Sequence, residues 1–221
     1  MRHRLLATLV RWLAAGLVLR VLAAILAEYP AYFPPDFDAL FLHGREATFA
    51  GLYRVAFYVH ILSGPVVLAN GLVLMSARVR RRRPGLHRVL GRVQVGVLLL
   101  LVLPSGVVMA RHAFGGGAAG LSFLLLSAVT AGCAVAGVAT ARRGRLDRHR
   151  VWMTRCYVLI CSAVVLRLTS GAAGLVGVSD PEAAYVVAAW ASWLVPLAAV
   201  EVVERWRAGA EPRQFAGGPG M

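Results

Sequence analysis

The stretch YRVAFYVHILSGPVVLANGLVLMSA, from Tyr53 to Ala77, decides the fold class of this chain. Its only charged side chain is Arg54, near the start. About 20 consecutive apolar residues cross the hydrocarbon core of a bilayer, where an isolated backbone must be helical to satisfy its own hydrogen bonds. The stretch therefore predicts a transmembrane helix.

The same rule predicts further spans, so we expect an all-α, polytopic bundle of about six transmembrane helices. The predicted spans lie near residues 5–27, 53–77, 89–110, 118–141, 151–176 and 183–203. Residues 1–207 would form one transmembrane helical domain. Residues 208–221, which are rich in Gly, Pro and Ala, are expected to be a disordered cytoplasmic tail. The first span is the weakest prediction, because Arg11 and Arg20 interrupt it.

The composition supports a membrane protein and argues against a nucleic-acid-binding one. Only 15% of the 221 residues are charged and 59% are hydrophobic, whereas a soluble domain carries about 25% charged residues. The net charge of +14 would ordinarily indicate phosphate binding. Here all basic residues are Arg, and they are clustered between apolar runs. We therefore expect the lipid bilayer as the partner of this chain, and no nucleic acid.

The distribution of Arg predicts the orientation, because short cytoplasmic loops retain positive charge. Only Arg45, Arg54 and Arg111 lie near one predicted face. Clusters of Arg lie near the other face, within residues 2–11, 78–92, 142–155 and 205–213. With an even number of spans, both termini are expected on the Arg-rich side. The prediction is an N-in/C-in, multi-pass protein of the cell membrane (the inner membrane of a bacterium), with anionic headgroups at its cytoplasmic face.

Several motifs together resemble a known family. They are His60 followed by Ser63-Gly64, PGLHRVLGR from Pro84 to Arg92, Pro104-Ser105-Gly106, HRVWMTRCY from His149 to Tyr157, and Leu166-Arg167-Leu168. The chain resembles, over roughly Tyr53 to Arg207, the uncharacterised bacterial membrane-protein family known as domain of unknown function 2306. Gln94 departs from the aromatic residue expected there, as do the aliphatic Val73 and Leu74 where a Gln is expected. The resemblance implies a multi-span architecture and brings no activity with it.

Four histidines lie in or at the ends of predicted spans, where ionisable groups are costly and often functional. With alternating span direction, His60 and His112 fall toward the outer face, whereas His87 and His149 fall at the inner face. His87 and His112 share one helical face but are separated by roughly 37 Å along the axis. These two side chains therefore cannot belong to one site.

The outer layer is the better candidate for function. Arg167 lies deep in the fifth span, and we expect it to face the bundle and meet His60, with Asp36 or Asp38 folding over from the external loop. The alternative is that Arg167 extends along its stem to the outer headgroups. The candidate ligand-binding residues are His60, His112, Arg167, Asn70 and Gln94.

The inner polar layer comprises His87, Arg92, His149 and Arg155. One interpretation is that these side chains anchor the helix ends in anionic headgroups. The other is haem b, because two histidines at matching depth could ligate the iron axially, either His60 with His112 or His87 with His149. No metal ligand set, catalytic residue or enzyme activity is assigned, because the sequence holds no nucleophile–base or Cys/His zinc spacing.

Three functions remain open from the sequence. The first is a protein with an outward-facing polar pocket that binds a small anionic or redox ligand. The second is a bis-histidine b-type haem or quinone-linked redox protein, and the third is a structural subunit of a membrane complex. An absorption spectrum separates the second from the others, and co-purification separates the third.

Overall fold

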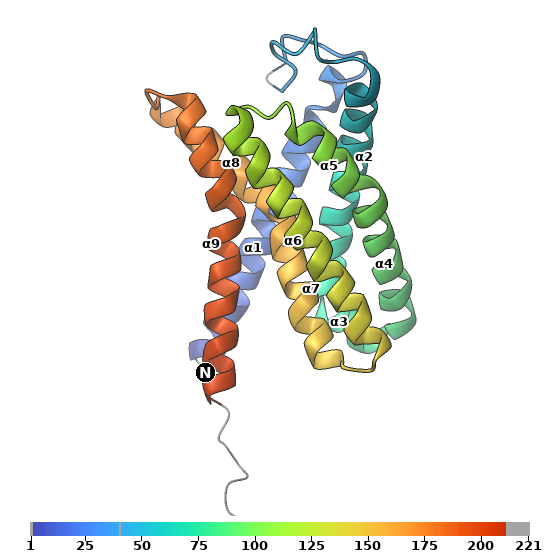
Figure 1. The fold of residues 1–221 in the computed structure, drawn as a ribbon. Helices are drawn as coiled ribbons and strands as arrows, with labels where there is room; N and C mark the ends of the chain where they lie inside the picture. The colour runs from blue at the N-terminus through green and yellow to red at the C-terminus, as the bar shows by residue number, and fades with distance from the viewer. Residues whose placement is uncertain (1, 40, 211–221) are drawn as a thin grey trace, which may run out of the picture.

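The computed structural model describes residues 2–39 and 41–210, which fold into a helical bundle (Figure 1). The helices are α1 (Arg2–Ala27), η1 (Tyr29–Ala31), α2 (Gly51–Met75), α3 (Ala77–Arg82), α4 (Pro84–Val97), η2 (Leu98–Val102), α5 (Leu103–Ala110), α6 (Gly116–Arg142), α7 (Leu146–Ile160), α8 (Ser162–Val176) and α9 (Pro181–Ala210).

Six helical segments among these residues are long and apolar enough to cross a membrane, which confirms the predicted fold class. They are Thr8–Ala31, Gly51–Met75, Pro84–Ala110, Gly116–Arg142, Leu146–Val176 and Pro181–Trp206. The third and fifth begin five residues before the predicted spans, at Pro84 and Leu146. Hydropathy locates the apolar core of a helix, whereas backbone hydrogen bonding continues through the flanking polar turn.

The two ends of the bundle differ in character. The start of α1 and the end of α9 lie together at one end, and the segment between α1 and α2 covers the other (Figure 1). We call the first the Arg-rich end, because the α3 and α6–α7 arginines lie there, and the second the loop end. The placement of the Arg-rich end in the cytoplasm stays a prediction from charge.

Two of the six transmembrane segments are irregular near their middle. In the third, Leu98–Val102 forms a π-helical turn immediately before α5, which has Pro104 in its first turn. Proline has no N–H, so the regular hydrogen-bond ladder cannot continue through it. In the fifth, α7 ends at Ile160 and α8 begins at Ser162.

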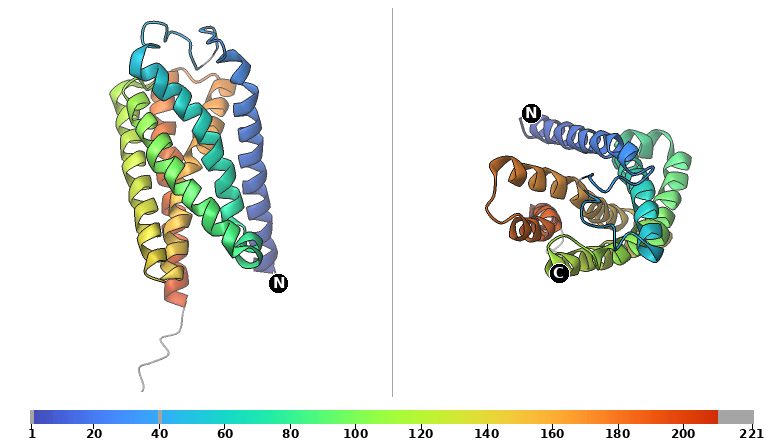
Figure 2. Two further views of the ribbon diagram at one scale, coloured as in Figure 1. Left: turned by 90° about the vertical axis from the view of Figure 1, so that its right-hand side faces the viewer. Right: turned by 90° about the horizontal axis from the view of Figure 1, so that it is seen from above.

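The bundle has a central core and a peripheral first helix. Val67, Leu98, Cys156, Leu159 and Trp193 belong to the central cluster, which joins α2, η2, α7 and α9. Helix α1 lies at one edge, beside α2 and α8 (Figure 2), and contributes Val18 and Val21 to a separate small cluster. The exposed surface of α1 suits contact with lipid.

The described part of the chain ends with α9, at Ala210. Residues 208–210 are helical, and residues 211–221 lie outside the described part of the chain. The disordered tail therefore stays a prediction.

Candidate functional site

Arg167 lies on α8 in the half of the bundle nearer the loop end. Its guanidinium donates a 3.1 Å hydrogen bond to the carbonyl of Ala163 one turn earlier. It interacts electrostatically with Tyr29, Tyr32 and Tyr185. Among the described residues, no carboxylate lies within ion-pair distance of Arg167, and the predicted contact with Asp36 or Asp38 is not formed. Arg167 is exposed, so the bundle does not enclose it as expected. The three tyrosines lie within electrostatic range of its charge, and its hydrogen bond among the described residues goes to its own helix.

The three tyrosines come from the segment after α1 and from α9, and their positions are set by hydrogen bonds and ring contacts. The Tyr29 hydroxyl donates to the carbonyl of Ile61, and the backbone of Tyr32 accepts a 3.0 Å hydrogen bond from the Tyr58 hydroxyl. Tyr185 packs edge-on against Phe114, with ring centroids 5.3 Å apart. The segment between α1 and α2 is therefore attached firmly to α2.

Tyr32 lies outside the transmembrane segments, and its environment keeps its hydroxyl protonated. Burial raises the pKa of the phenol, and the carboxylate of Glu28 raises it further, against an opposing effect of Arg167. A protonated phenol donates one hydrogen bond. Tyr32 therefore presents a neutral group beside the Arg167 charge.

His60 on α2 lies within electrostatic range of Arg167. Its Nδ1 lies 3.1 Å from the carbonyl oxygen of Val102 and 3.1 Å from Oγ of Ser105. A carbonyl only accepts hydrogen bonds, so Nδ1 carries a proton and donates. The Nε2 atom is left without a protein partner among the described residues. We call Arg167, His60, Tyr29, Tyr32 and Tyr185 the tyrosine cluster.

His112 does not join the tyrosine cluster. Its ring packs edge-on against Tyr53, with centroids 5.0 Å apart, and its carbonyl accepts a 2.6 Å hydrogen bond from Arg45. Tyr53 precedes His60 by seven residues on α2, or about two helical turns and roughly 10 Å. The predicted trio of His60, His112 and Arg167 is therefore not brought together, because His112 lies in the turn beyond α5.

Asn70 and Gln94 meet each other away from the tyrosine cluster. Asn70 Nδ2 donates to Oε1 of Gln94 at 2.9 Å and also contacts the carbonyl of Leu90 at 3.0 Å. Gln94 Nε2 in turn donates to the carbonyl of Val67 at 3.0 Å. These two predicted ligand-binding residues instead link α2 to α4, and the side-chain amide nitrogens of both donate to acceptors within the protein.

The inner polar layer of the sequence falls into three separate environments at the Arg-rich end. His87 and His149 lie within electrostatic range of each other. Arg92 is exposed. Arg155 forms a two-pronged ion pair with Glu201 on α9, with its Nε 2.5 Å from Oε1 and Nη2 2.9 Å from Oε2.

The HRVWMTRCY motif proves to attach α7 to three neighbouring helices. His149 Nδ1 lies 2.8 Å from the carbonyl of Gly137 on α6. Arg155 reaches α9, and Tyr157 donates a 3.1 Å hydrogen bond to the carbonyl of Leu68 on α2. A Cβ on Gly71 would overlap the Tyr157 ring. The motif therefore has a packing role that its sequence alone did not reveal.

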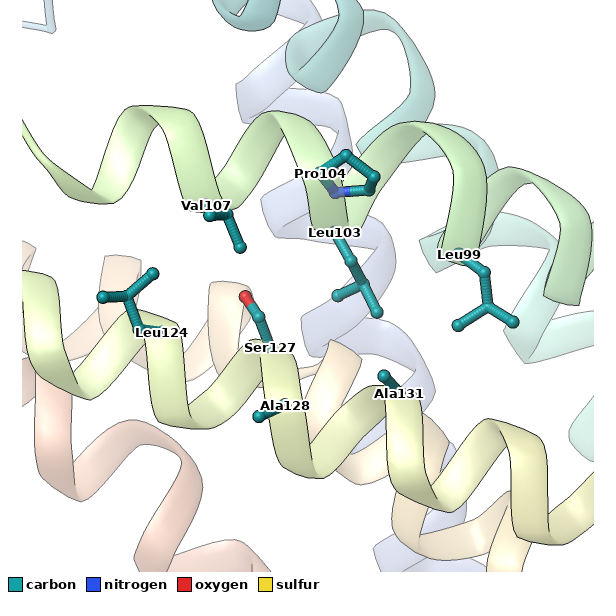
Figure 3. A pocket seen from close by; sticks show the side chains of 8 residues that line it. All are labelled: Leu99, Leu103, Pro104, Val107, Leu124, Ser127, Ala128 and Ala131. Atoms are coloured by element: carbon teal, nitrogen blue, oxygen red, sulfur yellow. The ribbon is translucent and has the colours of Figure 1, made fainter.

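Two apolar grooves on the surface of the bundle lie outside the tyrosine cluster. One of about 320 Å³ separates α5 from α6 and is lined by Leu99, Leu103, Pro104, Val107, Leu124, Ser127, Ala128 and Ala131 (Figure 3). Another of about 360 Å³ lies between α2 and the π-helical region, beside Val59 and Leu101. Neither groove is lined by a histidine or a charged residue, so both suit lipid chains.

The sequence interpretation missed the tyrosines of the cluster and the partner of Arg155. The segment between α1 and α2 was considered only as an external loop that carries Asp36 and Asp38. Glu201 lies within the last predicted span, and a search for opposite charges at matching depth would have paired it with Arg155. Tyr185 carried no comparable signal.

Comparison with known proteins assigns the family. A family model described as "Predicted membrane protein (DUF2306)" matches residues 57–203, about two thirds of the chain. The chain belongs to this family, which confirms the resemblance drawn from its motifs. No curated protein and no solved structure matches the chain significantly.

Proposed function

We propose that this DUF2306 membrane protein binds a small amphiphilic anion at the tyrosine cluster, as a binding or transport protein. The observation that carries the proposal is Arg167, a guanidinium within a transmembrane segment with no carboxylate at ion-pair distance among the described residues. Arginine in a span is costly and usually pairs with an opposite charge or faces a ligand pathway. An anionic ligand would supply the missing charge.

The charges around the loop end favour a ligand from the membrane over a free anion from water. Six carboxylates lie in the segment between α1 and α2 or beside the start of α9, and they outnumber Arg45, Arg54 and Arg111 at the same end: Glu28, Asp36, Asp38, Glu46, Asp180 and Glu182. Their field repels small anions approaching through water, over a Debye length of about 10 Å. An amphiphile held by its chain in the leaflet would approach Arg167 from the side.

The cluster offers distinct roles for its side chains. Arg167 can form a bidentate pair with a carboxylate or phosphate, which combines charge with a fixed geometry. We expect the hydroxyl of Tyr185 to donate to a further headgroup oxygen. We expect the Nε2 of His60, which carries no proton in the neutral ring, to accept from a headgroup hydroxyl. Tyr29 is already bonded to Ile61, so we expect it to position the segment and not to bind the ligand.

The test is a thermal melt of the purified protein in uncharged detergent, with laurate as the probe and dodecanol as its uncharged control. A ligand at 100 times its Kd stabilises the folded state by about 2.7 kcal/mol. We expect laurate to raise the melting temperature of the natural chain and of an Arg111→Gln variant, and to have no such effect on Arg167→Gln. Arg111 is an exposed arginine at the loop end, so it controls for surface charge. Equal stabilisation of both variants would refute the proposal.

The haem and structural-subunit hypotheses stay open and are tested on the same preparation. A Soret band in the absorption spectrum would support a bis-histidine haem, for which His87 and His149 are closer in level than His60 and His112. Stoichiometric co-purification of another membrane protein would support a structural role. The tyrosine cluster favours the ligand-binding proposal over both.

A further inference from the structure

A second cluster of basic side chains lies at the Arg-rich end, remote from Arg167. It consists of Arg80 on α3, His87 in the first turn of α4 and His149 in the first turn of α7. His87 interacts electrostatically with both Arg80 and His149. Arg80 and His149, which can each carry positive charge and come from two other helices, therefore lie within electrostatic range of His87, and we call the three groups the histidine cluster.

The hydrogen-bonding groups of the histidine cluster are incompletely satisfied. The Nδ1 atom of His87 is buried and has no hydrogen-bond partner. Buried polar atoms in proteins almost always have one, so an exception calls for an explanation such as an absent ligand. The Nδ1 atom of His149 is held by the Gly137 carbonyl at 2.8 Å. Its Nε2 atom is left without a protein partner in the described part of the chain.

No nearby carboxylate neutralises this charge. The sequence contains no Asp or Glu between Glu46 and Asp147, so α3, α4 and α6 carry none. Asp147 is exposed and engaged by Arg150 at 3.0 Å. The first-turn amides of α4 also point toward this end, and they add to the positive potential.

We propose that the histidine cluster binds a phosphate group, carried by a lipid headgroup of the adjacent leaflet or by a free phosphate compound. A phosphate brings up to two negative charges and several strong acceptor oxygens. Arg80, which is half-buried, supplies the fixed charge. The Nδ1 proton of His149 is bonded to Gly137, so His149 donates to the phosphate from Nε2 in its charged, doubly protonated form. The unpartnered Nδ1 of His87 donates to another oxygen. The site is independent of the tyrosine cluster, and it accounts for the unpartnered nitrogen of His87.

The experiment measures phosphate binding to the purified full chain in uncharged detergent. Native mass spectrometry follows phosphatidic acid, with phosphatidylcholine as the matched lipid, and equilibrium dialysis follows labelled inorganic phosphate. We expect Arg80→Gln and His87→Asn each to weaken binding about tenfold, the effect of one charge-assisted hydrogen bond. Arg82→Gln removes an exposed arginine from the same helix, so we expect a change of less than about twofold.

The arms of the experiment distinguish the two sources and the two sites. Selective binding of phosphatidic acid supports a lipid ligand, and binding of inorganic phosphate supports a free one. No binding in either arm, or equal weakening by Arg80→Gln and Arg82→Gln, overturns the proposal. Arg111→Gln, which changes an exposed arginine at the loop end, must leave binding unchanged. The loss caused by Arg80→Gln must also appear in an Arg167→Gln background, where the tyrosine cluster no longer contributes. Melting temperatures near that of the natural chain show that the variants fold.

Discussion

Arg155 and Arg167 lie twelve residues apart on the same transmembrane segment, but only Arg155 has a carboxylate partner among the described residues. Arg155 on α7 is bound by both carboxylate oxygens of Glu201 and lies over the Trp152 ring, 4.7 Å from its centroid. Arg167 on α8 bonds only to the backbone of its own helix. The charge on α7 is thus neutralised within the protein, whereas the charge on α8 is not.

Because of this difference, we expect α7 to contribute mainly to the stability of the bundle and Arg167 on α8 to contribute mainly to ligand binding. In α7, the polar side chains of the HRVWMTRCY motif bond to α2, α6 and α9, so removing one leaves a buried partner unsatisfied. In α8, removing the Arg167 charge leaves no protein partner behind. Substitutions at α7 contacts should therefore lower stability, whereas those at Arg167 should lower ligand affinity.

The largest effect is expected from Gly71→Ala, in the contact between α2 and α7. The added Cβ would overlap the ring of Tyr157, which is held by its hydrogen bond to Leu68. Overpacking of this kind costs about 1–3 kcal/mol, and we expect the upper end because the ring cannot turn away without losing that bond. Thermal or denaturant unfolding in detergent measures the change.

Gly64 on the same helix is the control, because nothing lies within 4 Å of a Cβ placed there. Gly64→Ala should be neutral or slightly stabilising, since Ala has the higher helix propensity, and the two variants differ only in position. Similar losses in both would mean that α2 tolerates no added methyl group and that the Tyr157 contact is not special.

Arg155→Gln should have the next largest effect. It removes the charge from a paired, partly buried site and leaves Glu201 without its partner. Hydrogen bonds to charged groups contribute about 1.5–3 kcal/mol, and we expect about 2 kcal/mol because Glu201 is partly exposed. Unfolding in detergent again provides the measurement.

Two further variants make this prediction specific. Arg150→Gln breaks the exposed pair with Asp147, which should change stability by about 0–1 kcal/mol. Adding Glu201→Gln to Arg155→Gln should restore part of the loss, because no isolated carboxylate then remains. A loss in the double variant equal to the sum of both single losses would contradict a direct coupling.

The sequence predicted the six spans well, because each needs only its own apolar residues to be recognised. It also indicated that Arg167 was unusual, since a deep arginine stands out in any span. It did not predict that Asn70 and Gln94 bond to each other, because their contact depends on how α2 and α4 are rotated. The sequence likewise did not indicate that three tyrosines lie within electrostatic range of Arg167, since Tyr32 and Tyr185 are 153 residues apart in the chain.

A smaller effect is expected from replacing the Asn70–Gln94 contact by leucines. Hydrogen bonds between helices in membrane proteins contribute about 0.6 kcal/mol on average, so Asn70→Leu with Gln94→Leu should lower stability by about that amount. Asn70→Leu alone should cost more, because the buried Gln94 carbonyl loses its donor. Melting curves of these two variants and of the natural chain test this order, and a larger loss in the double variant would refute it.

The smallest effect on stability is expected from Arg167→Gln, and it is the result that separates the two arginines most sharply. The only hydrogen bond at stake joins Arg167 to its own helix, so the free energy of unfolding without added ligand should change by less than about 0.5 kcal/mol. The same variant should lose the stabilisation by laurate. If Arg167→Gln instead destabilised the empty protein as much as Arg155→Gln does, Arg167 would be a structural contact of the bundle. The proposal that the polar groups of α7 bond within the protein while α8 binds a ligand would then be wrong.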